Sequence, residues 1–213
     1  MAIIKDSLHN QVYTVIRQKI LDQELKQGEL ILTKKIAEEH GISVMPVRNA
    51  LQKLTDYGLV IKKERVGYFV KDFSKKEIAE INDVRKMYEV HCLDEYFDFL
   101  DFGRIKEIHE IFKAKNKISL LEYRKMDVEL HNLFVSASHN EFLIKQYDRV
   151  KDLFWLFMFI DKNMKDNTRD ISEKEHIHIL EAILANKKEE AIQILKIHLD
   201  RVSNEAIKLL QKS

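Results

Sequence analysis

Four polar side chains in the C-terminal two thirds of the chain have types and spacings that suit a metal site. Asp127 and His131 are four residues apart, so on a helix both side chains point to the same face. His176 and His198 each share a predicted helix face with aliphatic residues, so these faces should also point into a core. Three imidazoles and a carboxylate that converge in a helical core can bind zinc, nickel, iron, copper or manganese.

The same four residues also fit a polar core without a metal ion. Buried polar groups must find hydrogen-bond partners, and an inward histidine is more often such a residue than a ligand. A D-x-x-x-H pair also arises by chance in helical proteins. The spacing alone therefore leaves both interpretations open.

The elements that must position these residues are helices, because the chain shows no convincing strand after residue 72. Ser-x-x-Glu capping boxes at Ser74, Ser119 and Ser172 predict three of the helix starts. A polar loop is expected at residues 162–169. The predicted helices cover residues 74–99, 103–117, 119–137, 140–159 and 172–185, with a last one from the turn at 186–188 to residue 210. This pattern predicts an all-helical antiparallel bundle over residues 73–213.

Residues 1–72 show a different pattern, in which helices are followed by two β-like runs. A helix over residues 8–25 precedes a short amphipathic helix at 33–40. Gly41 then breaks the helix, and Ser43 is placed to cap another one. That helix carries apolar residues three and four apart, at Val47, Ala50, Leu51 and Leu54. The β-like runs at 59–61 and 68–70 flank a charged tip. Together they predict a winged helix-turn-helix, whose second helix lies in the DNA major groove.

Composition agrees with a globular, mainly α protein of two domains. The chain has 213 residues, of which 45% are hydrophobic and 33% charged. A single cysteine, Cys92, excludes an internal disulfide and favours a reducing, cytoplasmic setting. The most apolar run, residues 153–160, is too short to span a bilayer. Residues 1–72 hold 12 basic and 9 acidic side chains, which gives a net charge of +3, and residues 73–213 have a net charge of −2.

The N-terminal part resembles the DNA-binding domain of the GntR family of bacterial transcription regulators. The similarity lies in K-I-A-E-E-H-G-I-S, P-V-R-N-A-L-Q-K-L, G-L-V and the wing G-Y-F-V. The resemblance implies DNA contacts by Lys34, Ser43, Arg48, Asn49, Arg65 and Gly67. Two departures bear on the operator sequence. Many members have an arginine in the segment that here reads Ser43-Val44-Met45-Pro46, and this chain lacks it. Asn49 stands where members usually have a glutamate, and it could itself read adenine.

Residues 74–210 resemble the FCD domain, the ligand-binding half of the FadR-type branch of this family. The similar segments surround Asp127 and His131, Asn140, His176, and His198. The resemblance implies one divalent transition metal ion per chain on Asp127, His131, His176 and His198, with zinc first and nickel, manganese or iron as alternatives. It also implies that Arg85 and Asn140 bind an effector. For Arg85, a plain ion pair with Glu89 is the competing interpretation.

The expected function is therefore a ligand-responsive DNA-binding regulator, most simply a repressor. It would bind an inverted-repeat operator as a homodimer and hold a small carboxylate effector beside the metal. Two alternatives remain open: a purely structural metal without an effector, and a helical metallohydrolase that activates water. Against the hydrolase, no separate general base is evident and a fused DNA-binding domain has no role.

Overall fold

The structure is a computed structural model, and it describes residues 8–114, 118–158 and 166–210. The chain divides into two compact units. One comprises Met1–Ser74 with Trp155–Ile160, and the other comprises Lys75–Phe154 with Asp161–Ser213. In the described part of the chain, no helix is long and apolar enough to cross a membrane.

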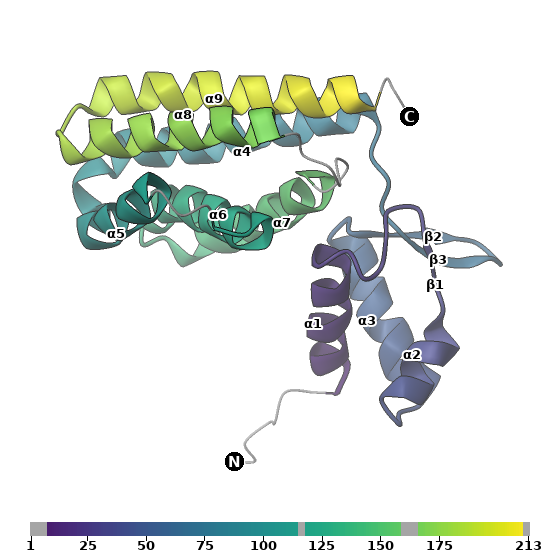
Figure 1. The fold of residues 1–213 in the computed structure, drawn as a ribbon. Coiled ribbons are helices and arrows are strands. Elements are labelled where there is room, and N and C mark those ends of the chain that lie inside the picture. The colour runs from purple at the N-terminus through teal and green to yellow at the C-terminus, as the bar shows by residue number, and fades with distance from the viewer. Residues whose placement is uncertain (1–7, 115–117, 159–165, 211–213) are drawn as a thin grey trace, which may run out of the picture. The chain divides into compact units, whose positions relative to one another are not determined.

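The first unit is a winged helix-turn-helix, as the sequence predicts (Figure 1). Its helices are α1 (Leu8–Leu21), α2 (Thr33–Glu39) and α3 (Val44–Asp56). The apolar positions of α3 are buried and α3 packs on α1, which explains their spacing of three and four. Gly41 ends the turn after α2 with a positive φ of 61°, which glycine adopts without strain.

The wing is a three-stranded antiparallel sheet in the order β1-β3-β2. Its strands are β1 (Leu30–Ile31), β2 (Val60–Lys63) and β3 (Gly67–Val70). The sequence did not predict β1, because two residues are too short to show an alternating pattern. Gly67 has a φ of 146°, and a Cβ there would lie 3.1 Å from a Leu30 methyl carbon. Glycine at this position therefore allows β1 to pack closely against the wing hairpin.

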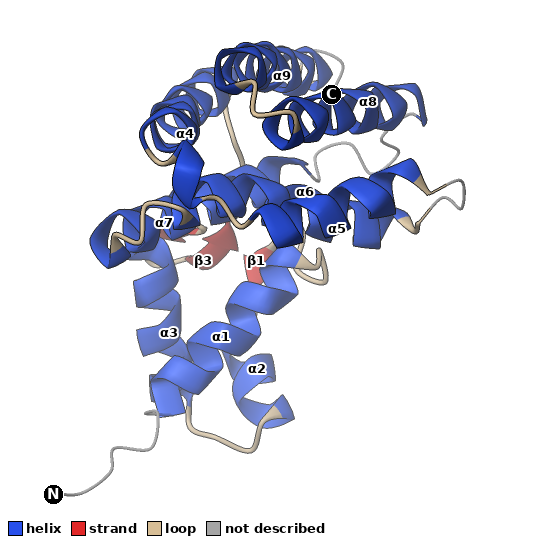
Figure 2. Ribbon diagram, turned by 90° about the vertical axis from the view of Figure 1, so that its left-hand side faces the viewer, coloured by secondary structure: helices blue, strands red, loops and turns tan. Residues whose placement is uncertain are grey.

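The second unit contains six α-helices among its described residues, in two layers (Figure 2). One layer holds α4 (Lys75–Glu95), α8 (Asp166–Leu184) and α9 (Lys188–Leu209), and the other holds α5 (Phe102–Lys113), α6 (Leu120–Ser136) and α7 (Glu141–Met158). Helix α9 packs between α4 and α8, while α5 and α6 bring the second layer against the first. The prediction of an all-helical second part is confirmed.

Helix boundaries differ from the sequence-based ones where tertiary contacts decide them. The capping box of Ser119 is present in both directions with Glu122. In contrast, the predicted start at Ser172 is wrong, because α8 already begins at Asp166. The Ser172 hydroxyl accepts a hydrogen bond from Arg201 of α9 instead.

Helix α4 ends at Glu95 and is followed by a 3₁₀ turn, Phe97–Phe99. Of the loop predicted at 162–169, residues 162–165 lie outside the described residues and the rest is helical.

Candidate metal centre and nucleic-acid interface

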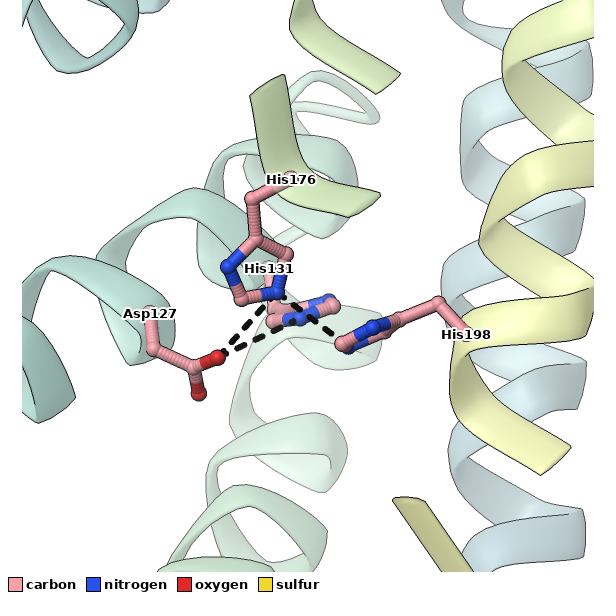
Figure 3. Close-up of side chains that lie close together, drawn as sticks. All are labelled: Asp127, His131, His176 and His198. Atoms are coloured by element: carbon pink, nitrogen blue, oxygen red, sulfur yellow. Dashed lines mark hydrogen bonds and ion pairs between the residues drawn. The ribbon is translucent and has the colours of Figure 1, made fainter. Parts of the chain in front are cut away.

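The side chains of Asp127, His131, His176 and His198 meet between the two helical layers (Figure 3). Helix α6 supplies the first two, one turn apart, and α8 and α9 supply one histidine each. All four are buried, and one nitrogen or oxygen atom of each lies within 4.8 Å of those of the others. The fold therefore brings together, from three helices, the four residues that the sequence predicted as a cluster.

The outer ring nitrogens of two histidines are held by carboxylates. His131 Nδ1 lies 2.6 Å from a Glu89 oxygen, and His198 Nδ1 lies 2.7 Å from a Glu175 oxygen. A carboxylate accepts a hydrogen from such a nitrogen, so we assign the Nδ1–H tautomer to both rings. Their Nε2 lone pairs then face the centre of the cluster. This carboxylate–histidine arrangement is the one that orients histidine ligands in metal proteins.

Glu175 is itself fixed by Arg201, which binds both of its carboxylate oxygens through Nε and Nη2. Although burial acts to raise it, hydrogen bonds from His198 and Arg201 hold the pKa of Glu175 at about 2. Glu175 is therefore ionised and keeps the His198 ring in one orientation. The sequence-based prediction missed Arg201; its position one helical turn after His198 was the only local signal.

The cluster contains more acceptors than donors, which favours a cation. His131 Nε2 has no hydrogen-bond partner among the described residues and lies 4.0 Å from Asp127 Oδ1. His176 Nε2 lies 3.2 Å from both Asp127 Oδ1 and His198 Nε2. A single ring hydrogen of His176 cannot satisfy three converging acceptors. Ligand atoms bonded at about 2.0–2.2 Å to one ion are separated by distances of this order, so the four residues fit a transition metal ion.

Burial also sets the protonation states that metal binding needs. It lowers the pKa values of His131 and His176 well below 6.5, and it lowers that of His198. The three rings are therefore neutral near pH 7, the form in which imidazole binds metals. Burial raises the pKa of Asp127 to about 7, so its carboxylate is not stabilised by the protein alone.

Asp127→Asn is expected to remove one component of the pH dependence of stability in metal-free protein. The folded state favours the protonated Asp127, so this carboxyl group favours folding below about pH 4, its ordinary pKa. That contribution is lost as the pH rises toward the folded-state value of about 7. Urea unfolding of chelator-treated protein between pH 5 and 7.5 measures it. Asp83→Asn, at an exposed site of α4, is the control. If the free energy of unfolding changed equally with pH in the wild type and in both variants, burial would not be what raises the pKa of Asp127.

Arg85 lies next to this centre in a second buried network. Its Nε donates to Glu89, which also accepts a hydrogen bond from Tyr147 and contacts His131. The guanidinium carbon lies 3.5 Å from the centre of the Phe154 ring. The ion pair with Glu89 is therefore present, yet Arg85 Nη1 is buried without a hydrogen-bond partner among the described residues. That nitrogen can still bind an acceptor.

Asn140, the other residue predicted to bind an effector, is exposed at the start of α7. Its side-chain oxygen accepts hydrogen bonds from the backbone N–H groups of Phe142 and Leu143. This is a helix-capping arrangement, and it accounts for the asparagine without a ligand.

Four of the six residues predicted to contact DNA line a groove of about 610 Å³ in the first unit: Lys34, Arg48, Arg65 and Gly67. Its lining includes five cations, none of which forms an ion pair with a described residue: Lys34, Arg48, Lys62, Lys63 and Arg65. Asn49 is exposed on α3 beside Arg48. Ser43 occupies the N-cap position of α3, as predicted, but its side chain makes no capping hydrogen bond, and the residue is exposed.

Comparison with known proteins agrees with this two-part architecture. The family described as "Bacterial regulatory proteins, gntR family" matches residues 8–70, and the FCD domain matches residues 80–201, more than half of the chain. The chain belongs to the GntR family. It is a transcriptional regulator of the FadR-type branch, with a GntR helix-turn-helix and an FCD domain.

Individual relatives support the same assignment. The regulator is 27% identical over 195 residues to an uncharacterised HTH-type transcriptional regulator, YdhC, of Bacillus subtilis, covering 89% of this chain and 87% of that one. It is 24% identical over 190 residues to the gluconate operon transcriptional repressor of the same organism, covering 86% and 77%. The relatives are regulators rather than enzymes, so the hydrolase alternative is set aside.

The helical unit also resembles a solved FCD domain that binds zinc. The Zn²⁺-bound FCD domain of TM0439 is 31% identical, with a TM-score of 0.59, covering 67% of this chain and 99% of that one. The same domain has also been solved without metal. The buried aspartate and three histidines of the regulator match this zinc-binding domain.

Proposed function

We propose that the regulator is a repressor that binds an inverted-repeat operator as a homodimer and responds to a small carboxylate. The DNA-binding function belongs to residues 1–72, and the metal and effector site belongs to residues 73–213. Since the target is bacterial DNA, the protein acts in the cytoplasm. The observation that carries the effector proposal is the buried, unpartnered Nη1 of Arg85 beside the Asp127 and histidine cluster.

Each chain is proposed to hold one divalent ion, with zinc first and nickel, manganese or iron as alternatives. Asp127, His131, His176 and His198 are the ligands, in neutral imidazole and carboxylate forms. When bound, the ion supplies a Lewis acid that a carboxylate can coordinate. Arg85 supplies a charge-assisted donor for the same carboxylate, since Glu89 leaves its Nη1 available.

Repression is supported by the gluconate operon transcriptional repressor among the relatives, and the name of that operon makes gluconate the first carboxylate to test. A carboxylate can change DNA affinity only if it binds the DNA-bound and free arrangements with different affinity. Operator binding should therefore be measured by fluorescence anisotropy with gluconate and a panel of hydroxy acids, in metal-loaded and chelator-treated protein. A carboxylate that shifts operator affinity only in metal-loaded protein is the expected result.

Absence of any carboxylate effect, with metal still bound, would favour the second candidate, in which the metal only stabilises the fold. That candidate is supported by the ligand arrangement, because one ion would join α6, α8 and α9. An Arg85→Lys variant separates the two readings. It keeps the charge but loses the planar donor, so it should weaken the effector response and leave metal content unchanged.

Operator affinity is expected to fall steeply as salt concentration rises. The four groove cations other than Arg48 can each neutralise a phosphate, and a dimer presents two such grooves. Counterion release then gives a slope of about −4 to −7 in log affinity against log salt concentration. Titrations from 50 to 300 mM salt, on a fixed operator sequence, measure it. A slope near zero would contradict the assignment of this groove to the DNA backbone.

A further inference from the structure

Met45 occupies an unusual place for a large apolar side chain. It is the second residue of α3 and is 63% exposed, whereas the other large apolar side chains of that helix are buried or half-buried. A single exposed methionine needs no explanation by itself. The first turn of this helix, however, is the part of a helix-turn-helix unit that meets base edges in the major groove.

The exposed face of α3 presents three side chains with different chemistry. Met45 lies one turn before Arg48 and Asn49, so the three side chains share that face. Arg48 and Asn49 have no partner among the described residues, whereas Gln52, one turn further on, donates to Asp56. The face that is free to bind therefore offers one apolar group, one guanidinium and one carboxamide.

Each of these groups suits a different feature of the major groove. Arginine pairs in a bidentate way with guanine, and asparagine pairs in the same way with adenine. A methionine side chain has no hydrogen to donate, but it is flexible and polarisable and packs against methyl groups. The one methyl group in the major groove is the C5 methyl of thymine.

We infer that Met45 is a specificity-determining residue that packs against a thymine methyl group in each operator half-site. Arg48 and Asn49 then read a guanine and an adenine at neighbouring base pairs. The inference rests on the proposed DNA-binding function and adds the kind of base that α3 selects. The other cations of the groove beside α3 supply the backbone contacts that bring the methyl group and Met45 together.

Replacing thymine by deoxyuracil tests this contact, because it removes the methyl group and keeps every hydrogen-bonding group. An operator is first selected from a random duplex library with the full-length protein. Each thymine of the selected half-site is then replaced in turn, symmetrically in both halves, and affinities are measured by anisotropy. Burial of one methyl group predicts about a four-fold loss per half-site at one thymine position.

The variants Met45→Ala and Met45→Leu show whether Met45 makes the contact. Met45→Ala should bind the thymine and uracil operators with equal affinity, and Met45→Leu should retain the preference for thymine. Met87→Ala removes a methionine of similar exposure, 71%, from α4 and should behave as the wild type.

Unchanged uracil sensitivity in Met45→Ala, or insensitivity of the wild type at every thymine, would overturn the inference while DNA binding stands. Failure to enrich any DNA sequence would overturn the proposed function together with the inference. The two kinds of failure are thus distinguishable in one series of experiments.

Discussion

His176→Ala is expected to abolish binding of the proposed metal ion. His176 Nε2 lies 3.2 Å from Asp127 Oδ1 and from His198 Nε2, so it lies between the proposed ligands of α6 and α9. Loss of a partner that only orients a ligand costs about 10- to 100-fold in metal affinity, and loss of the ligand itself should cost at least about 100-fold. Elemental mass spectrometry of protein purified without chelator measures the metal content per chain.

Thermal unfolding with and without added zinc provides a second readout for the same variant. A ligand that binds only the folded state raises the apparent stability, so the wild type should gain stability on addition of zinc and the variant should not. His176→Gln retains most of the side-chain volume that packs against Phe112 and Tyr123, and it separates loss of metal from loss of packing.

His178→Ala is the matched control, since His178 lies on the same helix but is exposed. It should keep a full equivalent of metal. Retention of a full equivalent by His176→Ala would show that the ligand set is wrong, and the four side chains would then form a hydrogen-bonded core.

Arg48→Ala is expected to abolish specific operator recognition without affecting the fold. Arg48 is exposed on α3, borders the basic groove and makes no ion pair with a described residue. A bidentate contact to guanine contributes about 1–3 kcal/mol, so each half-site should lose about 5- to 150-fold in affinity. The effect on the free energy of unfolding should stay within about 0.5 kcal/mol, because the side chain makes few contacts in the free protein.

Arg48→Lys distinguishes a base contact from a phosphate contact. Lysine keeps the charge but not the planar pair of donors, so it should preserve binding to random DNA and lose preference for the operator. The measurement is the ratio of the affinity for the operator to the affinity for a scrambled duplex, both at one salt concentration. An unchanged ratio in Arg48→Lys would assign Arg48 to the DNA backbone instead.

The sequence predicted the fold well because periodic patterns lie within single elements. The buried positions of α3 and the inward faces of α6, α8 and α9 follow directly from spacings of three and four residues. It could not show that the four polar residues meet, since this depends on how three helices pack. Only the resemblance to a family indicated that the four side chains converge.

Errors arose where a local pattern has a tertiary role. Ser172 and Glu175 have the spacing of a capping box, but both contact Arg201 from the next helix. For Arg85, the ion pair with Glu89 and the binding of an effector were treated as mutually exclusive. In the structure it pairs with Glu89 through one nitrogen and leaves another without a partner.

The three histidines of the cluster differ in how firmly their rings are held. Carboxylates fix the rings of His131 and His198, whereas His176 Nδ1 has no hydrogen-bond partner among the described residues. The ring of His176 lies against the rings of Phe112 and Tyr123, and this packing is what limits rotation about its Cβ–Cγ bond. If the site holds an ion, His176 would be the ligand whose orientation depends on aromatic packing on α5 and α6 rather than on a carboxylate. Substitutions of those two aromatic residues would then change how fast an ion enters and leaves, without removing any of the four proposed ligands.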